Sequence, residues 1–184
     1  MKLFQFFKSL LLLSQISNNS NLNTEINTVD INPYFYQGIW YQVYGDKFVL
    51  DTFERDAYCA CANYTILSEN KIDVYNWERK GSVDGPIEGI HGYALITDVP
   101  GQLDVYFYDK YPAPYWIINT GPIINEQYQY AIVTDPYMIG LYVLVRNITQ
   151  YYELYDNEVI VFLNESGFNK SYNKPIRIIH EGCK

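Results

Sequence analysis

The stretch Gly38–Gly45, GIWYQVYG, is the first of several short runs that are rich in aromatic and β-branched residues. Such residues favour β-strands, whereas Gly, Pro, Asn and Asp mark the turns between strands. Turn signals such as SENK, VDGP and DVPG separate the runs at regular spacing. The runs are IWYQVYG, YCACANYTI, KIDVYNWE, GIHGYALI, LDVYFY, YWIINT, YQYAIVT and GLYVLVR.

Eight runs joined by short turns predict an all-β fold, an eight-stranded antiparallel up-and-down barrel, because closure removes the exposed edges of a long sheet. A two-sheet sandwich is the alternative from this pattern. From Gln150 to Ser166, apolar residues recur at three- and four-residue steps, which predicts one C-terminal α-helix. Thr149 is expected to cap its start and Gly167 to end it. A short final strand is expected near 175–179.

The N-terminus has the layout of a secretory signal peptide. Lys2 precedes an apolar run that is too short to span a bilayer, and polar residues follow it. We expect residues 1–17 to be this leader and residues 18–184 to form a single domain. No later stretch is long enough to cross a membrane, so stable membrane insertion is not expected.

Asn-x-Ser/Thr triplets accompany this leader, which together predict a secreted, extracellular glycoprotein. A further triplet at Asn18 lies close to the expected cleavage position. The predicted glycosylation sites are Asn63, Asn147, Asn164 and Asn169.

The acidic charge argues against a nucleic-acid partner. The formal net charge is −8 for the whole chain, and about −10 without the leader, which carries two lysines and no acids. Binding to phosphates needs a basic surface. With 20 tyrosines and 48% hydrophobic residues, the chain can instead fill one sizeable core.

Catalytic and metal-binding patterns are sparse. The two histidines, His91 and His180, do not have the spacing of metal ligands, and Cys59 with Cys61 supplies only two of the four ligands of a tetrahedral site. No serine lies in a nucleophile-elbow pattern. We therefore expect no metal, no cofactor and no enzymatic activity.

Three motifs resemble those of the lipocalin family. Gly38 and Trp40 match the family's Gly-x-Trp motif. Thr134 and Asp135 resemble its second motif, either with Pro136 in place of the usual tyrosine or with Tyr137 as that tyrosine displaced by one position. Arg146 resembles the lone arginine that ends the last barrel strand. The motifs occur in order, and the resemblance extends from about residue 30 to the C-terminus.

Within the family, the similarity is strongest to the apolipoprotein D-like and bacterial outer-membrane lipocalins. It lies in residues 59–64, 69–76 and 113–117. The resemblance implies that Trp40 and Arg146 meet at the closed end of the barrel and are structural, with a ligand-binding role for Arg146 as the alternative. It also implies a disulfide between Cys59 and Cys183.

The odd number of cysteines leaves one thiol over. Strand alternation puts Cys59 and Cys61 on one face, so that Cys61 is an alternative partner for Cys183. The remaining thiol has three interpretations: an inert buried side chain, a partner in an intermolecular bridge, or a reactive thiolate in the pocket, as in lipocalin-type prostaglandin D synthase.

The resemblance implies that the barrel interior, or calyx, binds and transports a small hydrophobic ligand such as a fatty acid or sterol. The alternatives are an enzyme acting on a lipid or carotenoid through Cys61 or a carboxylate, and a secreted interaction protein with a filled calyx. The sequence leaves the ligand and the oligomeric state open. The predicted ligand-binding residues are Ile72, Val74, Asn76, Leu103, Val105, Phe107, Tyr115, Trp116, Tyr130 and Tyr142.

Overall fold

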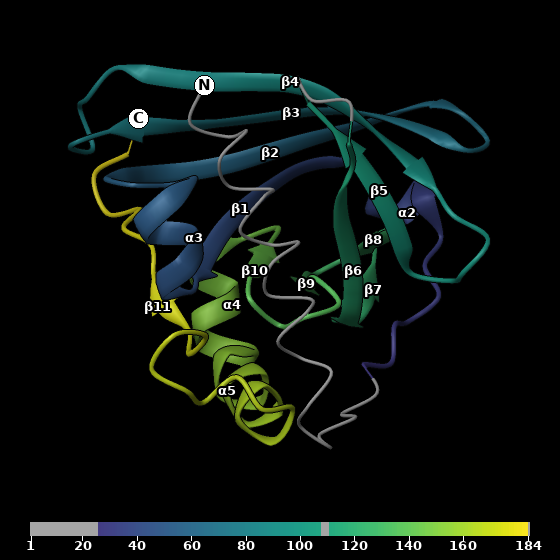
Figure 1. Cartoon of the computed structure of the whole chain (residues 1–184). Helices are drawn as coiled ribbons and strands as arrows, with labels where there is room; N and C mark the ends of the chain where they lie inside the picture. Colours follow the sequence, from purple (N-terminus) through teal and green to yellow (C-terminus); the bar gives the residue numbers. More distant parts are fainter. Residues whose placement is uncertain (1–25, 108–110, 184) are drawn as a thin grey trace.

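The computed structural model describes residues 26–107 and 111–183 of the chain. In this part, eight strands form an antiparallel sheet that closes where β10 pairs with β1 (Figure 1). The predicted barrel is confirmed, and the sandwich is excluded. The barrel strands are β1 (Gly38–Gly45), β2 (Ala57–Ser68), β3 (Lys71–Lys80), β4 (Ile87–Ile96), β5 (Gln102–Tyr106), β6 (Ala113–Thr120), β9 (Tyr130–Thr134) and β10 (Leu141–Val145).

Short elements lie in the connections. Helix α2 (Pro33–Tyr36) precedes β1, and the side chain of Asn32 caps it by accepting a hydrogen bond from the Tyr34 amide at 2.9 Å. Helix α3 (Lys47–Thr52) follows β1. A small hairpin, β7 (Ile123–Ile124) and β8 (Gln127–Tyr128), connects β6 to β9 and contacts α2.

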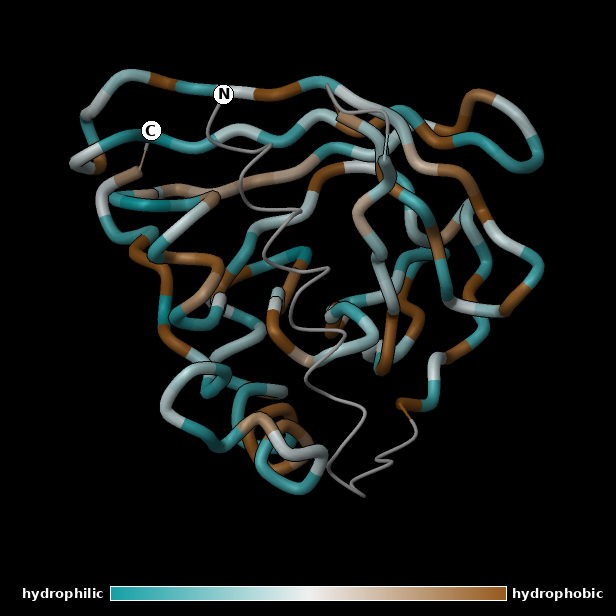
Figure 2. Tube along the Cα trace, in the orientation of Figure 1, coloured by the Kyte–Doolittle hydropathy of each residue, from teal (hydrophilic) through white to brown (hydrophobic). Residues whose placement is uncertain are grey.

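Alternation along the strands divides the apolar residues into two cores. Hydrophobic and hydrophilic segments alternate along the barrel (Figure 2), as expected for strands with two different faces. One core fills the barrel interior and includes Ile72, Val74 and Leu103. The other lies outside the barrel and includes Val43 and Ile132.

The predicted C-terminal helix is divided in two: α4 (Ile148–Leu154) and α5 (Asp156–Glu165). The break falls at Tyr155, whose φ is −121°. The predicted cap was wrong, because the side chain of Asn147, and not that of Thr149, accepts the hydrogen bond from the Gln150 amide at 3.0 Å. Gly167 follows α5 with a φ of +93°, which confirms the predicted left-handed end.

The two helices cover one side of the barrel (Figure 1). Tyr151, Val159 and Leu163 are buried against the outer faces of β1, β9 and β10. The predicted final strand is β11 (Ile176–Arg177), which pairs with β1. No helix in the described ranges is long and apolar enough to cross a membrane. The predicted leader, residues 1–17, lies outside the described residues.

Candidate functional site

The barrel encloses a cavity of about 480 Å³. Its walls are side chains from β1 to β6 and β10, and the segment after α3 contributes Phe53 and Glu54. Phe53 and Tyr111 line the cavity and are exposed, with 45% and 60% of their surface accessible. The cavity therefore opens to solvent at this end, which we call the mouth.

Eight of the ten predicted ligand-binding residues line this cavity. On β3, Ile72 and Val74 are buried, and Asn76 follows them on the same inward face. Because inward residues recur every second position, β5 presents Leu103 and Val105 in the same way. The other three that line the cavity are Phe107, Tyr115 and Tyr142.

The other two, Trp116 and Tyr130, lie on the outside of the barrel. Trp116 follows the inward Tyr115 and pairs with Gln102, so alternation turns it outward. Tyr130 packs against Tyr155 of the helical segment, with ring centroids 5.6 Å apart, and donates a hydrogen bond to Glu158 Oε1 at 3.1 Å. Neither side chain is placed to contact a molecule in the calyx.

Three tyrosines form a hydrogen-bonded group inside the barrel, here called the tyrosine cluster: Tyr36, Tyr64 and Tyr115. The Tyr36 and Tyr115 hydroxyl oxygens are 2.7 Å apart, and those of Tyr64 and Tyr115 are 3.3 Å apart. Burial raises the pKa of Tyr64 to about 12, and it also raises the pKa values of Tyr36 and Tyr115 well above the ordinary value. The cluster therefore stays neutral and gives the apolar cavity a satisfied polar patch.

A second polar region lies toward the mouth. Gln42 is buried, with 6% of its surface accessible, and its Nε2 donates a hydrogen bond to Glu54 Oε2 at 2.7 Å. Glu78 forms an ion pair with Lys80. Burial, together with the nearby charge of Glu78, raises the pKa of Glu54 to about 8, so this carboxyl group is mostly protonated at neutral pH.

Asn76 contributes an unsatisfied polar atom to the cavity wall. Its Oδ1 is buried without a hydrogen-bond partner. In the strand register, Asn76 faces Ala62 on β2 and Ile90 on β4, two other cavity-lining residues. A buried polar group without a partner costs about 1–3 kcal/mol, and such atoms are rare in folded proteins.

The closed end of the barrel is built around Trp40 and Arg146. The Arg146 guanidinium lies 3.6 Å from the centre of the Trp40 ring. It also donates hydrogen bonds to the backbone oxygens of Tyr36, Gln37 and Ile39 at 2.9, 2.8 and 2.6 Å. Trp40 is fully buried and its Nε1 donates to the Tyr36 oxygen at 2.8 Å. This geometry supports a structural role for both side chains.

The motif at Thr134 and Asp135 builds the turn between β9 and β10. Asp135 Oδ2 accepts hydrogen bonds from the amides of Ile139 and Gly140 at 3.1 and 2.6 Å, and Oδ1 accepts one from Tyr137 at 2.7 Å. Thr134 is buried. Gly38, in the first motif, has a φ of +96°, a conformation that favours glycine.

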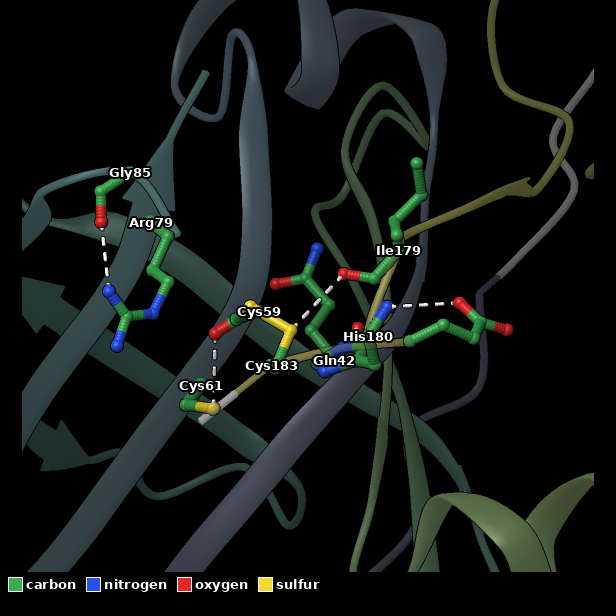
Figure 3. Close-up of a disulfide and its surroundings, with 9 residues drawn as sticks. Gln42, Cys59, Cys61, Arg79, Gly85, Ile179, His180 and Cys183 are labelled. Atoms are coloured by element: carbon green, nitrogen blue, oxygen red, sulfur yellow. Dashed lines mark hydrogen bonds between the residues drawn. A yellow bond between two sulfur atoms is a disulfide. The ribbon is translucent and has the colours of Figure 1, made fainter. Parts of the chain in front are cut away.

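The disulfide joins Cys59 and Cys183, as the resemblance implies, and Cys61 is the free cysteine (Figure 3). The alternation argument about the two cysteines of β2 was wrong. The pairing of β2 with β3 shifts register between Tyr58 and Cys61, and Cys59 has a φ of +56°. This bulge breaks the period of two, so the two thiols are not equivalent candidates for the bridge.

Cys61 lacks the environment of a reactive thiol. Its Sγ donates to the Cys59 backbone oxygen at 3.2 Å (Figure 3). Burial raises the pKa of the Cys61 thiol to about 12, so the nucleophilic thiolate is scarce at neutral pH. His91 stacks on Tyr75 on the barrel surface, and His180 Nε2 lies 2.7 Å from the Gln42 backbone oxygen. Residues 26–107 and 111–183 contain no group of three or more side chains that could hold a metal.

The predicted glycosylation sites lie at four different positions. Asn147, Asn164 and Asn169 are exposed, and Asn63 is half-buried on β2. Asn147 also caps α4 through Oδ1. The triplet at Asn18 lies outside the described residues.

Sequence reasoning missed several cavity residues. Tyr64 could have been found, because it lies on the inward side of β2 with Ala62, once the strand's alternation is followed from its C-terminal half. Glu54 follows a helix in a connection, where no periodicity indicates the direction of a side chain. Gln42 and Glu78 are polar residues on strands whose neighbours are apolar or aromatic, and alternation alone ranks them below those neighbours.

The described fold and cavity define a calyx-bearing antiparallel barrel, and comparisons with known proteins agree. The model of the lipocalin-like domain family matches residues 29–171, more than half of the chain. The protein therefore belongs to this family. No curated protein matches it in sequence.

Solved structures share the fold at low sequence identity. Lobster apocrustacyanin A1 has a TM-score of 0.57 and 13% identity, over 81% of this chain and 79% of that chain. The cockroach allergen Per a 4 has a TM-score of 0.56 and 19% identity, over 86% and 94%. Japanin from Rhipicephalus appendiculatus, in a structure bound to cholesterol, has a TM-score of 0.54 and 10% identity, over 83% and 98%.

Proposed function

We propose that the protein is a secreted carrier that binds a small hydrophobic molecule in its calyx. The observation that carries this proposal is the cavity of about 480 Å³, which lies within the size range of small-molecule sites. Its walls are apolar side chains such as Val74, Leu103 and Val105, with few polar groups among them. Burial of an apolar ligand against such walls is favourable by about 25 cal/mol per Å².

A lipid such as a sterol or a fatty acyl chain fits this cavity in shape and polarity. The tyrosine cluster offers hydroxyl groups beside an apolar wall, which suits a ligand with one polar end. Japanin, a structural neighbour, is described as bound to cholesterol. The resemblance of residues 59–64, 69–76 and 113–117 to apolipoprotein D-like lipocalins, which rests on the sequence alone, favours the same class of ligand.

Secretion is part of the proposal and has separate support. The N-terminal sequence has the pattern of a signal peptide, and Asn-x-Ser/Thr triplets such as Asn164 and Asn169 lie on the exposed surface. The disulfide between Cys59 and Cys183 is typical of oxidising compartments.

The two alternative functions have less support. An open cavity argues against a calyx filled by its own side chains. The raised pKa of the Cys61 thiol argues against an enzyme that uses a thiolate.

Native mass spectrometry of protein secreted from eukaryotic cells tests the carrier function directly. We expect a stoichiometric lipid that solvent extraction releases and identifies. Val105→Lys should abolish its retention, because this side chain would put a charge among the apolar walls. Asp104→Lys is the matched control, since Asp104 lies next to Val105 on the outward face of β5 and should leave retention unchanged.

The proposal fails if the folded protein carries no lipid and also rejects a neutral fluorescent probe such as N-phenylnaphthylamine. A lipid that is retained equally by Val105→Lys would place the binding site outside the calyx. Chemical modification of the lipid during incubation would favour the enzyme.

A further inference from the structure

The polar groups of the calyx differ in whether they already have partners. The tyrosine cluster satisfies itself through two hydroxyl-to-hydroxyl hydrogen bonds. Asn76 does not, because its Oδ1 is buried without a partner. A ligand therefore gains more from reaching Asn76 than from reaching the tyrosines.

The lysine side chain that lines the cavity already has partners. Lys80 is the one cationic side chain among the described residues that line it. Its Nζ forms an ion pair with Glu78 and donates a hydrogen bond to the Arg55 backbone oxygen at 3.0 Å. Glu54 and Glu88 add two further carboxyl groups to the wall. The lining thus contains three acids for one engaged base.

The strand register places Asn76 near the carboxyl groups of the cavity wall. Asn76 and Glu78 are two residues apart on β3, and both line the cavity. Glu88, on β4, lies opposite Glu78 in the pairing of β3 with β4. The polar end of a ligand at Asn76 would therefore lie about 7 Å along the strand from Glu78, on the side of the cavity that contains the carboxyl groups.

Resting on the proposed function, we propose that the calyx selects a lipophilic alcohol over the carboxylate of the same chain length. Asn76 binds the hydroxyl group, and the pairing of Lys80 with Glu78 leaves no unpaired cation among the described lining residues for an anionic head group.

A hydroxyl group fits Asn76 in either orientation of the amide. The amide turns readily about its last side-chain bond, since such terminal torsions have broad minima. A hydroxyl group can donate to Oδ1 or accept from Nδ2, whereas a carboxylate can only accept. The alcohol can therefore satisfy the orphan oxygen, and the carboxylate cannot.

The surroundings also disfavour a negative charge. Burial raises the pKa of Glu54 to about 8, which means that this region already suppresses the ionisation of its own carboxyl group. A carboxylate guest would lose its hydration in the same region, and no described lining residue offers it an unpaired ammonium or guanidinium group. The hydroxyl group of an alcohol also loses its hydration, but it carries no charge and regains a hydrogen bond at Asn76, so the cost is smaller.

The test compares dodecanol with dodecanoate at pH 7, by displacement of N-phenylnaphthylamine from the full-length secreted protein. We expect the wild-type protein to bind dodecanol at least about tenfold more tightly. Asn76→Leu should weaken dodecanol binding about fivefold and leave dodecanoate binding unchanged. Asn63→Leu, on the outward side of the neighbouring strand, is the matched control and should change neither when all the proteins are made without N-linked glycans.

Glu78→Gln tests the second half of the inference. This variant releases Lys80 from its ion pair and should strengthen dodecanoate binding about fivefold or more, with little effect on dodecanol. If Asn76→Leu fails to fold, Glu78→Gln still tests whether the paired state of Lys80 disfavours dodecanoate. Unchanged dodecanoate binding by folded Glu78→Gln would contradict the proposed selectivity.

Tighter or equal binding of dodecanoate by the wild-type protein would overturn the selectivity while leaving the carrier function intact. Unchanged dodecanol binding by folded Asn76→Leu would remove Asn76 from the site. If the wild-type protein binds neither ligand nor the probe, the carrier function itself fails, and this inference fails with it.

Discussion

The two ends of the barrel differ in how they hold charged groups. At the closed end, the Arg146 guanidinium stacks on Trp40 and donates to several backbone oxygens. Burial lowers the pKa of Arg146 to about 10, and the side chain is still charged at neutral pH. At the mouth, burial raises the pKa of Glu54 to about 8. Burial also raises the pKa of Asp46, which caps α3 just after β1, to about 7.

The two ends differ in how the protein surrounds their charged groups. Fixed backbone dipoles replace water around Arg146, so its charge is compatible with a closed, rigid end. Glu54 at the mouth accepts a hydrogen bond from the Gln42 side chain, and its carboxyl group changes charge near neutral pH. The closed end therefore stabilises the barrel, whereas the mouth end contains a carboxyl group whose charge changes near neutral pH.

The largest expected effect comes from Trp40→Ala at the closed end. Trp40 is fully buried under Arg146, so its removal leaves a large cavity and an arginine without its aromatic partner. We expect the free energy of unfolding to fall by about 3–5 kcal/mol in chemical denaturation. Trp116→Ala, on the half-buried outer face, is the control and should cost much less. Equal losses would mean that the closed end has no special role.

The second largest expected loss of stability comes from opening the disulfide. Cys183→Ser opens a bridge that links residues 124 positions apart, and we expect the free energy of unfolding to fall by about 2–4 kcal/mol. Cys61→Ser keeps the bridge and should change stability by less than about 1 kcal/mol. Thiol counting should find one free thiol in the wild-type protein and none in Cys61→Ser. A bridge that re-forms through Cys61 would contradict the assignment.

The mouth makes stability depend on pH. The pKa of Glu54 is about 8 in the folded protein, against an ordinary value of 4.5, so between these values the folded state binds more protons than the unfolded state. Stability should therefore fall as the pH rises from about 5 to about 8. Asp46, whose pKa is also raised, contributes in the same direction.

Glu54→Gln should flatten this dependence without abolishing it, because Asp46 remains. The measurement is the melting temperature across this pH range. Glu153→Gln, an exposed acid on α4, is the control and should keep the wild-type slope. A wild-type slope in Glu54→Gln would show that Glu54 does not stay protonated in the calyx.

The sequence predicts most of the barrel because strand alternation and turn chemistry are local. All eight aromatic-rich runs became barrel strands, and the alternation on β3 and β5 placed Ile72, Val74, Leu103 and Val105 correctly at the cavity. Strand alternation and turn chemistry fail to predict the structure where contacts between distant parts of the chain determine it. The bulge at Cys59 changes which side chains share a face, and no residue pattern marks it.

The helix break and the position of Glu54 depend on contacts between distant parts of the chain. Asp156, just after the break at Tyr155, accepts a hydrogen bond from the Tyr44 hydroxyl on β1 at 2.8 Å. Glu54 lies in a connection and is held by Gln42 from β1. Helical periodicity within residues 150–166 contains no information about either partner.

The smallest expected effect concerns the start of α4, just after Arg146 at the closed end. Asn147 Oδ1 caps this helix by accepting from the Gln150 amide, whereas Thr149 is exposed within the first turn. Asn147→Ala should therefore lower the free energy of unfolding by about 1 kcal/mol, and Thr149→Ala by less than about 0.5 kcal/mol. For a chain of this size, the first change corresponds to about 2–4 °C in melting temperature.

Both substitutions also remove the same Asn-x-Thr triplet, which makes them a matched pair in protein made without N-linked glycans. Any difference between them then reports on the cap alone. If Thr149→Ala proves the more destabilising, the helix begins as its sequence predicts and the contact of Asn147 is incidental. The closed end would then depend on Trp40 and Arg146 without support from the start of the helix that follows them.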